Sequence, residues 1–104
     1  MDMKKMMKQA QKMQRDLNAA QEEIKSMSAE ASAGGGMVKV VALGDNTLES
    51  ITIDPEAVDP EDVEMLQDMV LAAANEALRS VAEAAAKRLE SVTGGMGGMG
   101  LPGF

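Results

Sequence analysis

The sequence contains no histidine, cysteine, tyrosine or tryptophan, and its one aromatic residue is Phe104. Without histidine and cysteine, the Ser-His-Asp and Cys-His nucleophile systems are excluded, and so are the zinc and iron sites that use those ligands. The missing cysteine also excludes a disulfide framework, which fits a reducing compartment. These absences argue against an enzyme, and any core must be built from aliphatic residues and methionine.

Long apolar runs are absent as well. The longest is far below the roughly 20 residues that a membrane-spanning helix needs. The N-terminus is basic, but no apolar segment follows it, which argues against a secretory signal. We therefore expect a cytoplasmic protein with no membrane partner, and the 104 residues suggest a single domain.

Charge is distributed unevenly along the chain, whose net charge is −7. The first fifteen residues carry five basic residues and one acidic residue, whereas the remaining 89 carry five basic and sixteen acidic residues. A basic segment on an acidic body suggests an element that binds a polyanion and is held away from the body. A solvated helix face is the simpler explanation of such a charge run.

Residues 2–26 are predicted to form one long helix, because good helix formers dominate and no glycine or proline interrupts them. Apolar residues recur at alternating steps of three and four residues, at Met3, Met6, Ala10, Met13, Leu17, Ala20, Ile24 and Met27. This 3.5-residue repeat is typical of a coiled coil. We call these eight residues the apolar seam.

The same register places the basic residues on the other side of this helix. With Met3 at heptad position a, positions b, c and f hold Lys4, Lys5, Lys8, Lys12, Arg15 and Lys25. The acidic residues Asp2, Asp16 and Glu23 fall at position g, beside the seam. The helix would be about 37 Å long, close to one turn of B-DNA at about 34–36 Å. The predicted helix thus has an apolar edge and a basic edge.

Three strands are predicted after this helix. Residues 27–33 alternate between apolar and polar, which is the period of a strand, although these residue types form strands weakly. Residues 37–43 and 47–53 are rich in β-branched side chains and are joined by a short turn, so they predict an antiparallel hairpin. In the third strand, simple alternation places Leu48 and Ile51 on opposite faces.

A second helix is predicted over residues 60–92. Asp59 suits the N-cap, Pro60 suits the first helical position, and the acids that follow suit the positive end of the helix dipole. One side of this helix is apolar, with Val63, Leu66, Met69, Val70, Ala73, Ala77, Val81, Ala84 and Ala85. Residues 93–104 contain six glycines and are expected to be a disordered tail, so the single domain covers residues 1–92.

Two clusters resemble catalytic or ligand-binding motifs but have structural explanations. The carboxylates Asp54, Glu56, Asp59, Glu61, Asp62, Glu64 and Asp68 lack the glycine of a calcium loop and the aromatic residues that line a sugar cleft. They favour stabilisation of a helix N-terminus. Gly34-Gly35-Gly36 leads into a strand rather than a helix, so it favours a turn over a phosphate-binding loop. The sequence therefore predicts no catalytic residue, no metal and no cofactor or small-molecule substrate.

The basic edge is the remaining candidate site. Lys4, Lys8, Lys12 and Arg15 share one helix face and could neutralise consecutive phosphates. Lysine reads no base edges, and no aromatic side chain is present to stack unpaired bases, so this pattern favours duplex DNA with little sequence specificity. Two alternatives are an adaptor that binds proteins through its seam and a peripheral membrane protein, for which the seam is narrow. Two helices and three strands cannot cover both the sheet and the seam, which predicts a homodimer.

Five segments in order resemble a known family. They are Met6–Gln14, Gly36–Val40, Ile51–Pro55, Glu64–Val70 leading into Ala72–Ala77, and the end of the chain at Leu101–Phe104. Across nearly the whole chain, this pattern is similar to the YbaB/EbfC family of bacterial nucleoid-associated proteins. The chain departs from the family in its acidity outside the first helix and in its late run of alanines.

The resemblance implies an α+β subunit of α-β-β-β-α order, with a three-stranded antiparallel sheet and two long helices. It also implies an intertwined, tweezer-like homodimer that binds double-stranded DNA in the nucleoid, without enzymatic activity. DNA contacts in the family are attributed to basic residues on the projecting helices. Here these correspond to Lys4, Lys5, Lys8, Lys12, Arg15, Lys87 and Arg88.

Overall fold

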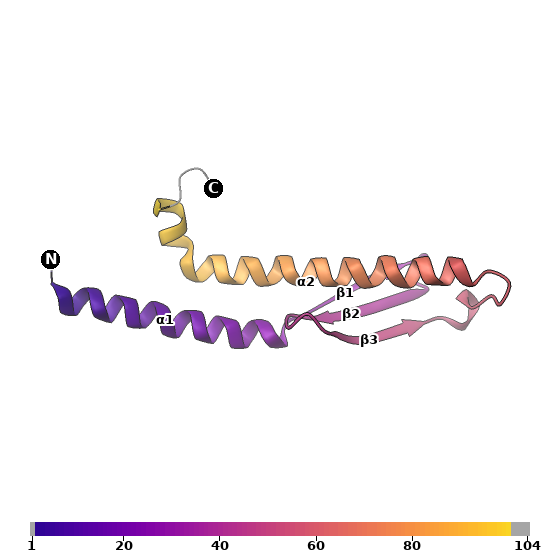
Figure 1. Cartoon of the computed structure of the whole chain (residues 1–104), viewed down its shortest axis with the longest axis horizontal. Helices are drawn as coiled ribbons and strands as arrows, with labels where there is room; N and C mark the ends of the chain where they lie inside the picture. The colour runs from indigo at the N-terminus through magenta and orange to yellow at the C-terminus, as the bar shows by residue number, and fades with distance from the viewer. Residues whose placement is uncertain (1, 101–104) are drawn as a thin grey trace.

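The chain folds into a helix, a three-stranded antiparallel sheet and a second helix, which confirms the predicted α-β-β-β-α order (Figure 1). The computed structural model describes residues 2–100, and the side chains of residues 2–93. The elements are α1 (Met3–Ser26), β1 (Ser28–Ala33), β2 (Val38–Leu43), β3 (Leu48–Ile53), the 3₁₀ helix η1 (Pro55–Ala57) and α2 (Val63–Gly100). The molecule is elongated, with principal extents of 72 × 28 × 16 Å.

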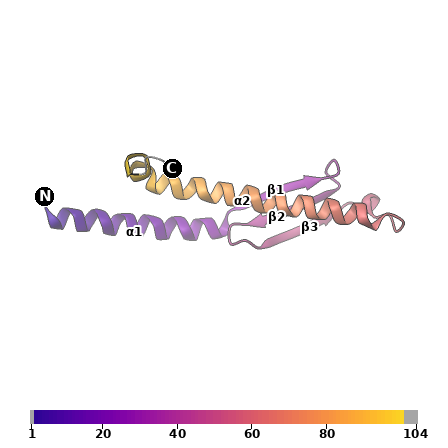
Figure 2. The same ribbon diagram turned by 45° about the horizontal axis from the view of Figure 1, so that its top comes forward.

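One helix packs on the sheet and the other projects from it. Helix α1 projects away from the sheet, and the N-terminus lies at the far end of the molecule (Figures 1 and 2). Helix α2 packs across β1 and β2 and then continues beside α1. We call α1 the arm. Its C-terminal end, the base, packs against the rest of the fold, and its N-terminal end, the tip, extends beyond it.

The core lies between α2 and one face of the sheet. Val38, Val40 and Ala42 of β2 are fully buried against Ala73, Ala77 and Val81 of α2. On α2 these residues are spaced at four-residue intervals, so they form one stripe that faces the sheet. The fully buried core is therefore built from valine and alanine side chains.

Strand β1 consists of residue types that form strands weakly, and it is stabilised by the residues that pack around it. β1 is antiparallel to β2, and its alanines at 29, 31 and 33 pair with Ala42, Val40 and Val38 on the face that packs against α2. The lack of side-chain bulk at these positions lets α2 approach β1 closely. Tertiary pairing thus outweighs the low intrinsic strand preference of alanine and serine.

A β-bulge changes the predicted face of Leu48. The antiparallel register pairs Val41 with Ser50 but the next residue, Ala42, with Leu48, so Glu49 is the extra residue. An extra residue reverses the alternation beyond it. Leu48 therefore joins Ile51 and Ile53 on the face that carries buried Ala42, and the prediction of opposite faces was wrong.

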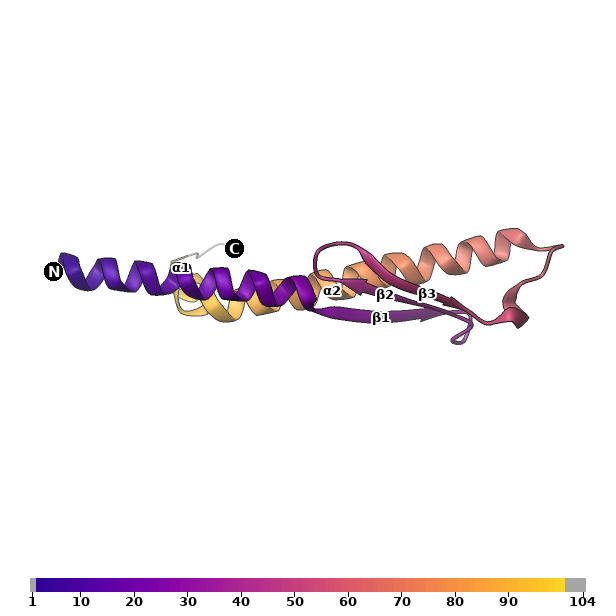
Figure 3. The ribbon, with the colours of Figure 1, turned by 90° about the horizontal axis from the view of Figure 1, so that it is seen from below.

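The other face of the sheet is mostly polar. Among the described residues no helix covers this face, which Figure 3 shows from below. It carries Ser28, Glu30, Ser32, Lys39, Ser50 and Thr52, all exposed, with Val41 and Leu43 half-buried. One packed face and one solvated face are typical of an antiparallel sheet.

Helix α2 begins later than the sequence predicts. The predicted N-cap, Asp59, accepts a hydrogen bond from the Glu61 backbone N–H at 2.9 Å, which closes a turn before the helix. The carboxylate of Asp62 accepts from the Met65 N–H at 3.2 Å and so caps α2, which starts at Val63. Both aspartates suit a cap by residue type, and the turn at 60–61 decides between them.

The C-terminal segment also differs from the prediction. Helix α2 continues to Gly100 rather than ending near residue 92, and its last turns bend away from the helix axis (Figure 1). Propagating an existing helix adds a backbone hydrogen bond per residue, and no proline interrupts the chain before Pro102. Paired glycines are a common cause of helix bends. The rest of the expected disordered tail, residues 101–104, lies outside the described residues.

The β2–β3 turn is held by its own polar side chains. Asn46 adopts a left-handed conformation (φ 68°), which asparagine tolerates better than most residues. The Asp45 carboxylate accepts hydrogen bonds from the backbone N–H and the hydroxyl of Thr47. The hydroxyl bond lowers the pKa of Asp45 below its usual value. Residues 44–46 thus form a compact turn at the base of the arm.

Gly44 lets this turn pack directly against the end of α1. Its N–H donates to the Met27 carbonyl oxygen at 2.9 Å. A Cβ at this position would lie 1.7 Å from the carbonyl oxygen of Ile24, which is backbone and cannot rotate away. The base of the arm is therefore packed against the sheet at a position that requires glycine.

We expect Gly44→Ala to lower the free energy of unfolding by about 2–3 kcal/mol, because the overpacked backbone has to shift. Urea denaturation followed by circular dichroism measures this change. Gly35→Ala is the control, since a Cβ there meets no atom within 4 Å and costs only the left-handed backbone strain of about 1–2 kcal/mol. A Gly44→Ala protein as stable as the wild type would contradict the close packing.

Candidate nucleic-acid interface

The apolar seam of α1 divides into a covered part and an exposed part. Near the sheet, Ala20 and Ile24 are buried, and Leu17 is half-buried. Toward the tip, Met3, Met6 and Ala10 are exposed and Met13 is half-buried. We call these last four residues the outer seam. Among the described residues, α2 and the sheet therefore cover only the base of the arm.

The predicted basic edge lies on the exposed surface of the arm. Lys4, Lys5, Lys8 and Arg15 are exposed, and no described carboxylate lies within ion-pair distance of them. Lys12 forms an ion pair with Asp16 at 3.6 Å, and both side chains remain at least half exposed. Surface ion pairs of this kind contribute little to stability, so Lys12 can exchange Asp16 for another anion.

Asp2 positions the first turn of this arm. Its carboxylate accepts a hydrogen bond from the Lys4 backbone N–H at 3.0 Å, and α1 begins at Met3. This cap occupies the positive end of the helix dipole. The capped helix carries Lys4, Lys8, Lys12 and Arg15 at steps of three or four residues, which rise about 4.5–6 Å each along the axis. The arm thus displays a regular row of positive charge.

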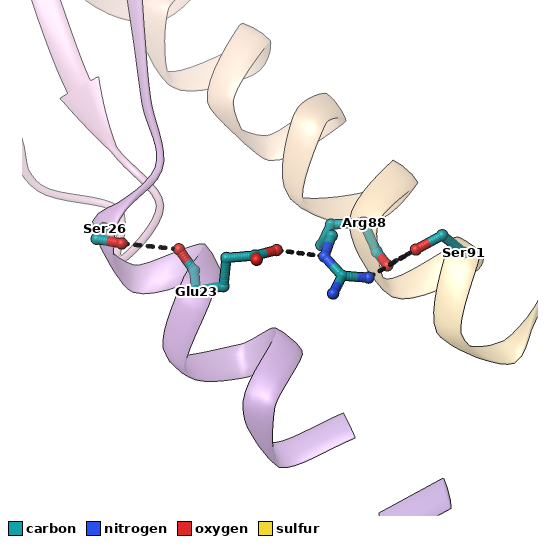
Figure 4. A network of polar contacts seen from close by, with 4 residues as sticks. All are labelled: Glu23, Ser26, Arg88 and Ser91. Atoms are coloured by element: carbon teal, nitrogen blue, oxygen red, sulfur yellow. Dashed lines mark hydrogen bonds and ion pairs between the residues drawn. The ribbon is translucent and has the colours of Figure 1, made fainter. Parts of the chain in front are cut away.

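The two predicted basic residues of α2 have different surroundings. Lys87 is exposed, whereas Arg88 is half-buried between the helices. The Arg88 Nε donates to a carboxylate oxygen of Glu23 on α1, and its Nη1 donates to the Ser91 hydroxyl at 2.7 Å (Figure 4). Among the described residues, this is the one ion pair that joins α1 to α2. Arg88 therefore links α2 to the arm by a side-chain ion pair.

Sequence reasoning did not assign this partner to Arg88, although a signal was present. Glu23 occupies heptad position g, beside the apolar seam. Charged residues at this position commonly pair with a neighbouring helix. The neighbour's register could not be derived from α1 alone, so the pairing with Arg88 required the tertiary structure.

The structure brings together some of the predicted cations and separates others. Lys12 and Arg88 line one cleft between the helices, together with Asp16, Ala19, Ser91 and Val92. Lys4, Lys5 and Lys8 lie farther out on the arm. The basic surface therefore runs from the tip of α1 toward the α1–α2 junction, where Asp16 and Glu23 partly neutralise it.

A group of seven acidic residues occupies the other end of the molecule. The segment that carries the carboxylates from Asp54 to Asp68 includes η1 and the start of α2, which lie opposite the N-terminus (Figure 1). Among the described residues, no group of three or more potential metal-ligating side chains is found. No described helix is long and apolar enough to cross a membrane. Opposite charges thus gather at opposite ends of an elongated molecule.

The α-β-β-β-α order and the row of cations on the projecting helix make this chain an α+β protein with a candidate nucleic-acid-binding surface. A family model described as the YbaB/EbfC DNA-binding family matches residues 1–96. The chain therefore belongs to the YbaB/EbfC DNA-binding family.

Individual relatives agree with this assignment. The chain is 57% identical over 99 residues to a nucleoid-associated protein of Acetivibrio thermocellus, covering 95% of this chain and 86% of the relative. It is 44% identical over 109 residues to a nucleoid-associated protein of Saccharopolyspora erythraea, covering 99% and 94%. Among solved structures, the uncharacterized protein HP0035 from Helicobacter pylori matches with a TM-score of 0.67 and 26% identity, covering 84% of this chain and 91% of that one.

Proposed function

We propose that this protein is a non-enzymatic, nucleoid-associated protein that binds duplex DNA as a homodimer, through phosphate contacts with little sequence specificity. The observation that carries the proposal is the exposed row of cations on the α1 arm. The family membership and the names of the relatives support the DNA partner. The contacts are assigned to Lys4, Lys5, Lys8, Lys12 and Arg15.

The charge distribution supports a contact made by the arm rather than by the body. The arm tip is basic, whereas the rest of the chain is strongly acidic and is repelled by phosphate. The duplex is therefore expected to approach the tip, and the acidic end is expected to point away from it. Lys87 is a secondary candidate, and the charge of Arg88 is already paired with Glu23.

The homodimer is supported by an uncovered apolar groove beside β3. It is lined by Leu48, Ile51, Ile53, Leu66, Gln67, Val70, Leu71 and Ala74, and its exposed large side chains are Leu48 (41%), Ile51 (46%) and Leu71 (61%). Among the described residues, the outer edge of β3 has no strand partner. An exposed edge strand next to an apolar groove is a template for a second chain. A second copy of this chain would cover both features and leave the arms projecting.

The proposed function is tested by measuring affinity for duplex DNA of random sequence as a function of salt concentration. We expect log K to fall linearly with log salt, with a slope of about −4 to −7 for roughly four to eight phosphate contacts per dimer. The expected contacts are electrostatic, so duplexes of different sequence should bind within a few fold of one another. Absent binding, or binding that does not respond to salt, would contradict the proposal.

A further inference from the structure

The outer seam is an apolar surface without a role in phosphate binding. Met3 is 74% exposed and Met6 is 50% exposed. An open groove follows this side of the helix and is lined by Met6, Gln9, Ala10, Met13 and Gln14. A partner helix fits such a surface, because the seam keeps the 3.5-residue repeat of a coiled coil up to the tip.

We infer that the outer seam pairs with the outer seam of another dimer, so that two arms join back to back and hold two DNA duplexes together. The pairing surface is the outer seam, and its occupant is a second copy of this chain. The duplex-holding consequence rests on the proposed function, whereas the pairing of arms does not.

The charge pattern favours a second arm as the occupant. Two arms that each carry a net positive charge would normally repel one another. Here the flanking e and g positions from Met3 to Gln14 hold Met7, Gln9 and Gln14, which carry no charge. The lysines of the arm occupy positions b, c and f, on the other side of the helix. Two outer seams can therefore meet with the cations on the outside, and like charges across a coiled-coil interface are avoided.

The side-chain sizes favour an antiparallel arrangement. In an antiparallel pair, each a position lies beside a d position of the other helix. Centring the pair near Lys8 places Met6 of one arm over Ala10 of the other, and Met3 beside Met13. A long side chain thus fills the space above a small one. Methionine adapts readily to such gaps because its side chain is unbranched and flexible.

This geometry gives the arm pair a basic surface on both sides. Each arm turns its row of cations away from the shared seam, so the two rows face in opposite directions. One duplex can lie on each side. The paired seam spans only residues 3–13, so a single pair of arms is expected to associate weakly. Binding of many dimers to the same duplexes would raise the effective concentration of arms and make the pairing persistent.

Two single substitutions in the same turn of α1 distinguish arm pairing from DNA binding. Ala10→Glu places a carboxylate in the middle of the outer seam, whereas Gln11→Glu places one at position b, away from the seam. Both residues are exposed in the structure, glutamate forms helices well, and both variants change the charge of the arm equally. The Gln11→Glu carboxylate lies on the basic edge and repels phosphate, so this variant should bind a single duplex no more tightly than Ala10→Glu. Any advantage that Gln11→Glu keeps in holding two duplexes together therefore comes from arm pairing.

The first measurement is sedimentation of the full chain without DNA, at high micromolar concentration. Species larger than the dimer are expected for the wild type and for Gln11→Glu, and are expected to be lost in Ala10→Glu. The second measurement is the amount of a labelled duplex that the protein retains on beads carrying another duplex. This amount should be at least about tenfold lower for Ala10→Glu than for Gln11→Glu. Gel shifts with one duplex should show that Gln11→Glu binds no more tightly than Ala10→Glu.

Equal capture by the two variants, together with equal sedimentation, would overturn the arm pairing. If the wild type fails to bind duplex DNA in the gel shift, the proposed function is wrong, but sedimentation still tests the pairing. Association that is lost equally in both variants would show a general charge effect and would also overturn the inference.

Discussion

Replacing Lys4, Lys8 and Arg15 with alanine is expected to weaken DNA binding about 100-fold or more at about 0.1 M salt. The slope of log K against log salt concentration should also become shallower, by about 2–3 for each arm that contacts DNA. Each cation that neutralises a phosphate releases counterions, so its loss reduces both the affinity and the salt dependence. Alanine keeps the helix intact, because it has the highest helix propensity. Gel shifts over a series of salt concentrations measure both quantities.

The matched control removes three cations that are not assigned to DNA contacts. Lys25 and Arg79 pair with glutamates on their own helices at 3.1 Å and 2.5 Å, and Lys39 lies on the polar face of the sheet. Replacing these three with alanine changes the net charge by the same amount. If this control variant loses as much affinity and slope as the arm variant, binding depends on net charge rather than on the arm.

Leu71→Asp is expected to dissociate the proposed homodimer, with the dissociation constant raised by about 100-fold or more. Leu71 is 61% exposed in the subunit, so the change leaves the subunit core intact. In the dimer it would place a carboxylate without a partner in an apolar interface, which costs about 3 kcal/mol or more. Sedimentation equilibrium at low micromolar protein should show a monomer for this variant and a dimer for the wild type.

Ala72→Asp is the control, because residue 72 is exposed on α2 but does not line the groove. It introduces the same side chain into the same helical turn and should remain a dimer. Dimers in both variants would place the subunit interface elsewhere, and a monomeric wild type would contradict the homodimer itself. Circular dichroism should show the same helix content in all three proteins.

The sequence predicted the elements well where local pattern controls structure. The heptad spacing of α1 depends on neighbours three and four residues apart, and the helix appears as expected. β2 and β3 are rich in β-branched residues, and they form the predicted hairpin. The N-cap of α2 shows the limit of this reasoning, because Asp59 and Asp62 are both good caps and the turn between them selects the second.

Other features depended on contacts between distant parts of the chain. The bulge at Glu49 moved Leu48 to the face of the sheet that adjoins α2, and this completed the apolar groove beside β3. Alternation within one strand could not reveal the bulge, because an extra residue is defined by the partner strand. Likewise, the ion pair between Glu23 and Arg88 joins residues on two helices whose relative register is set by packing on the sheet.

By itself, the sequence determined the order of helices and strands and the opposite edges of the α1 arm, because both follow from side-chain periodicity within a segment. Only the tertiary structure decided that α2 and the sheet cover the base of the arm and leave Met3, Met6 and Ala10 of the outer seam exposed. The pairing of Arg88 with Glu23 of the arm also depends on the tertiary structure. These outcomes follow from how α2 packs across β1 and β2, a contact between distant segments that no local periodicity encodes.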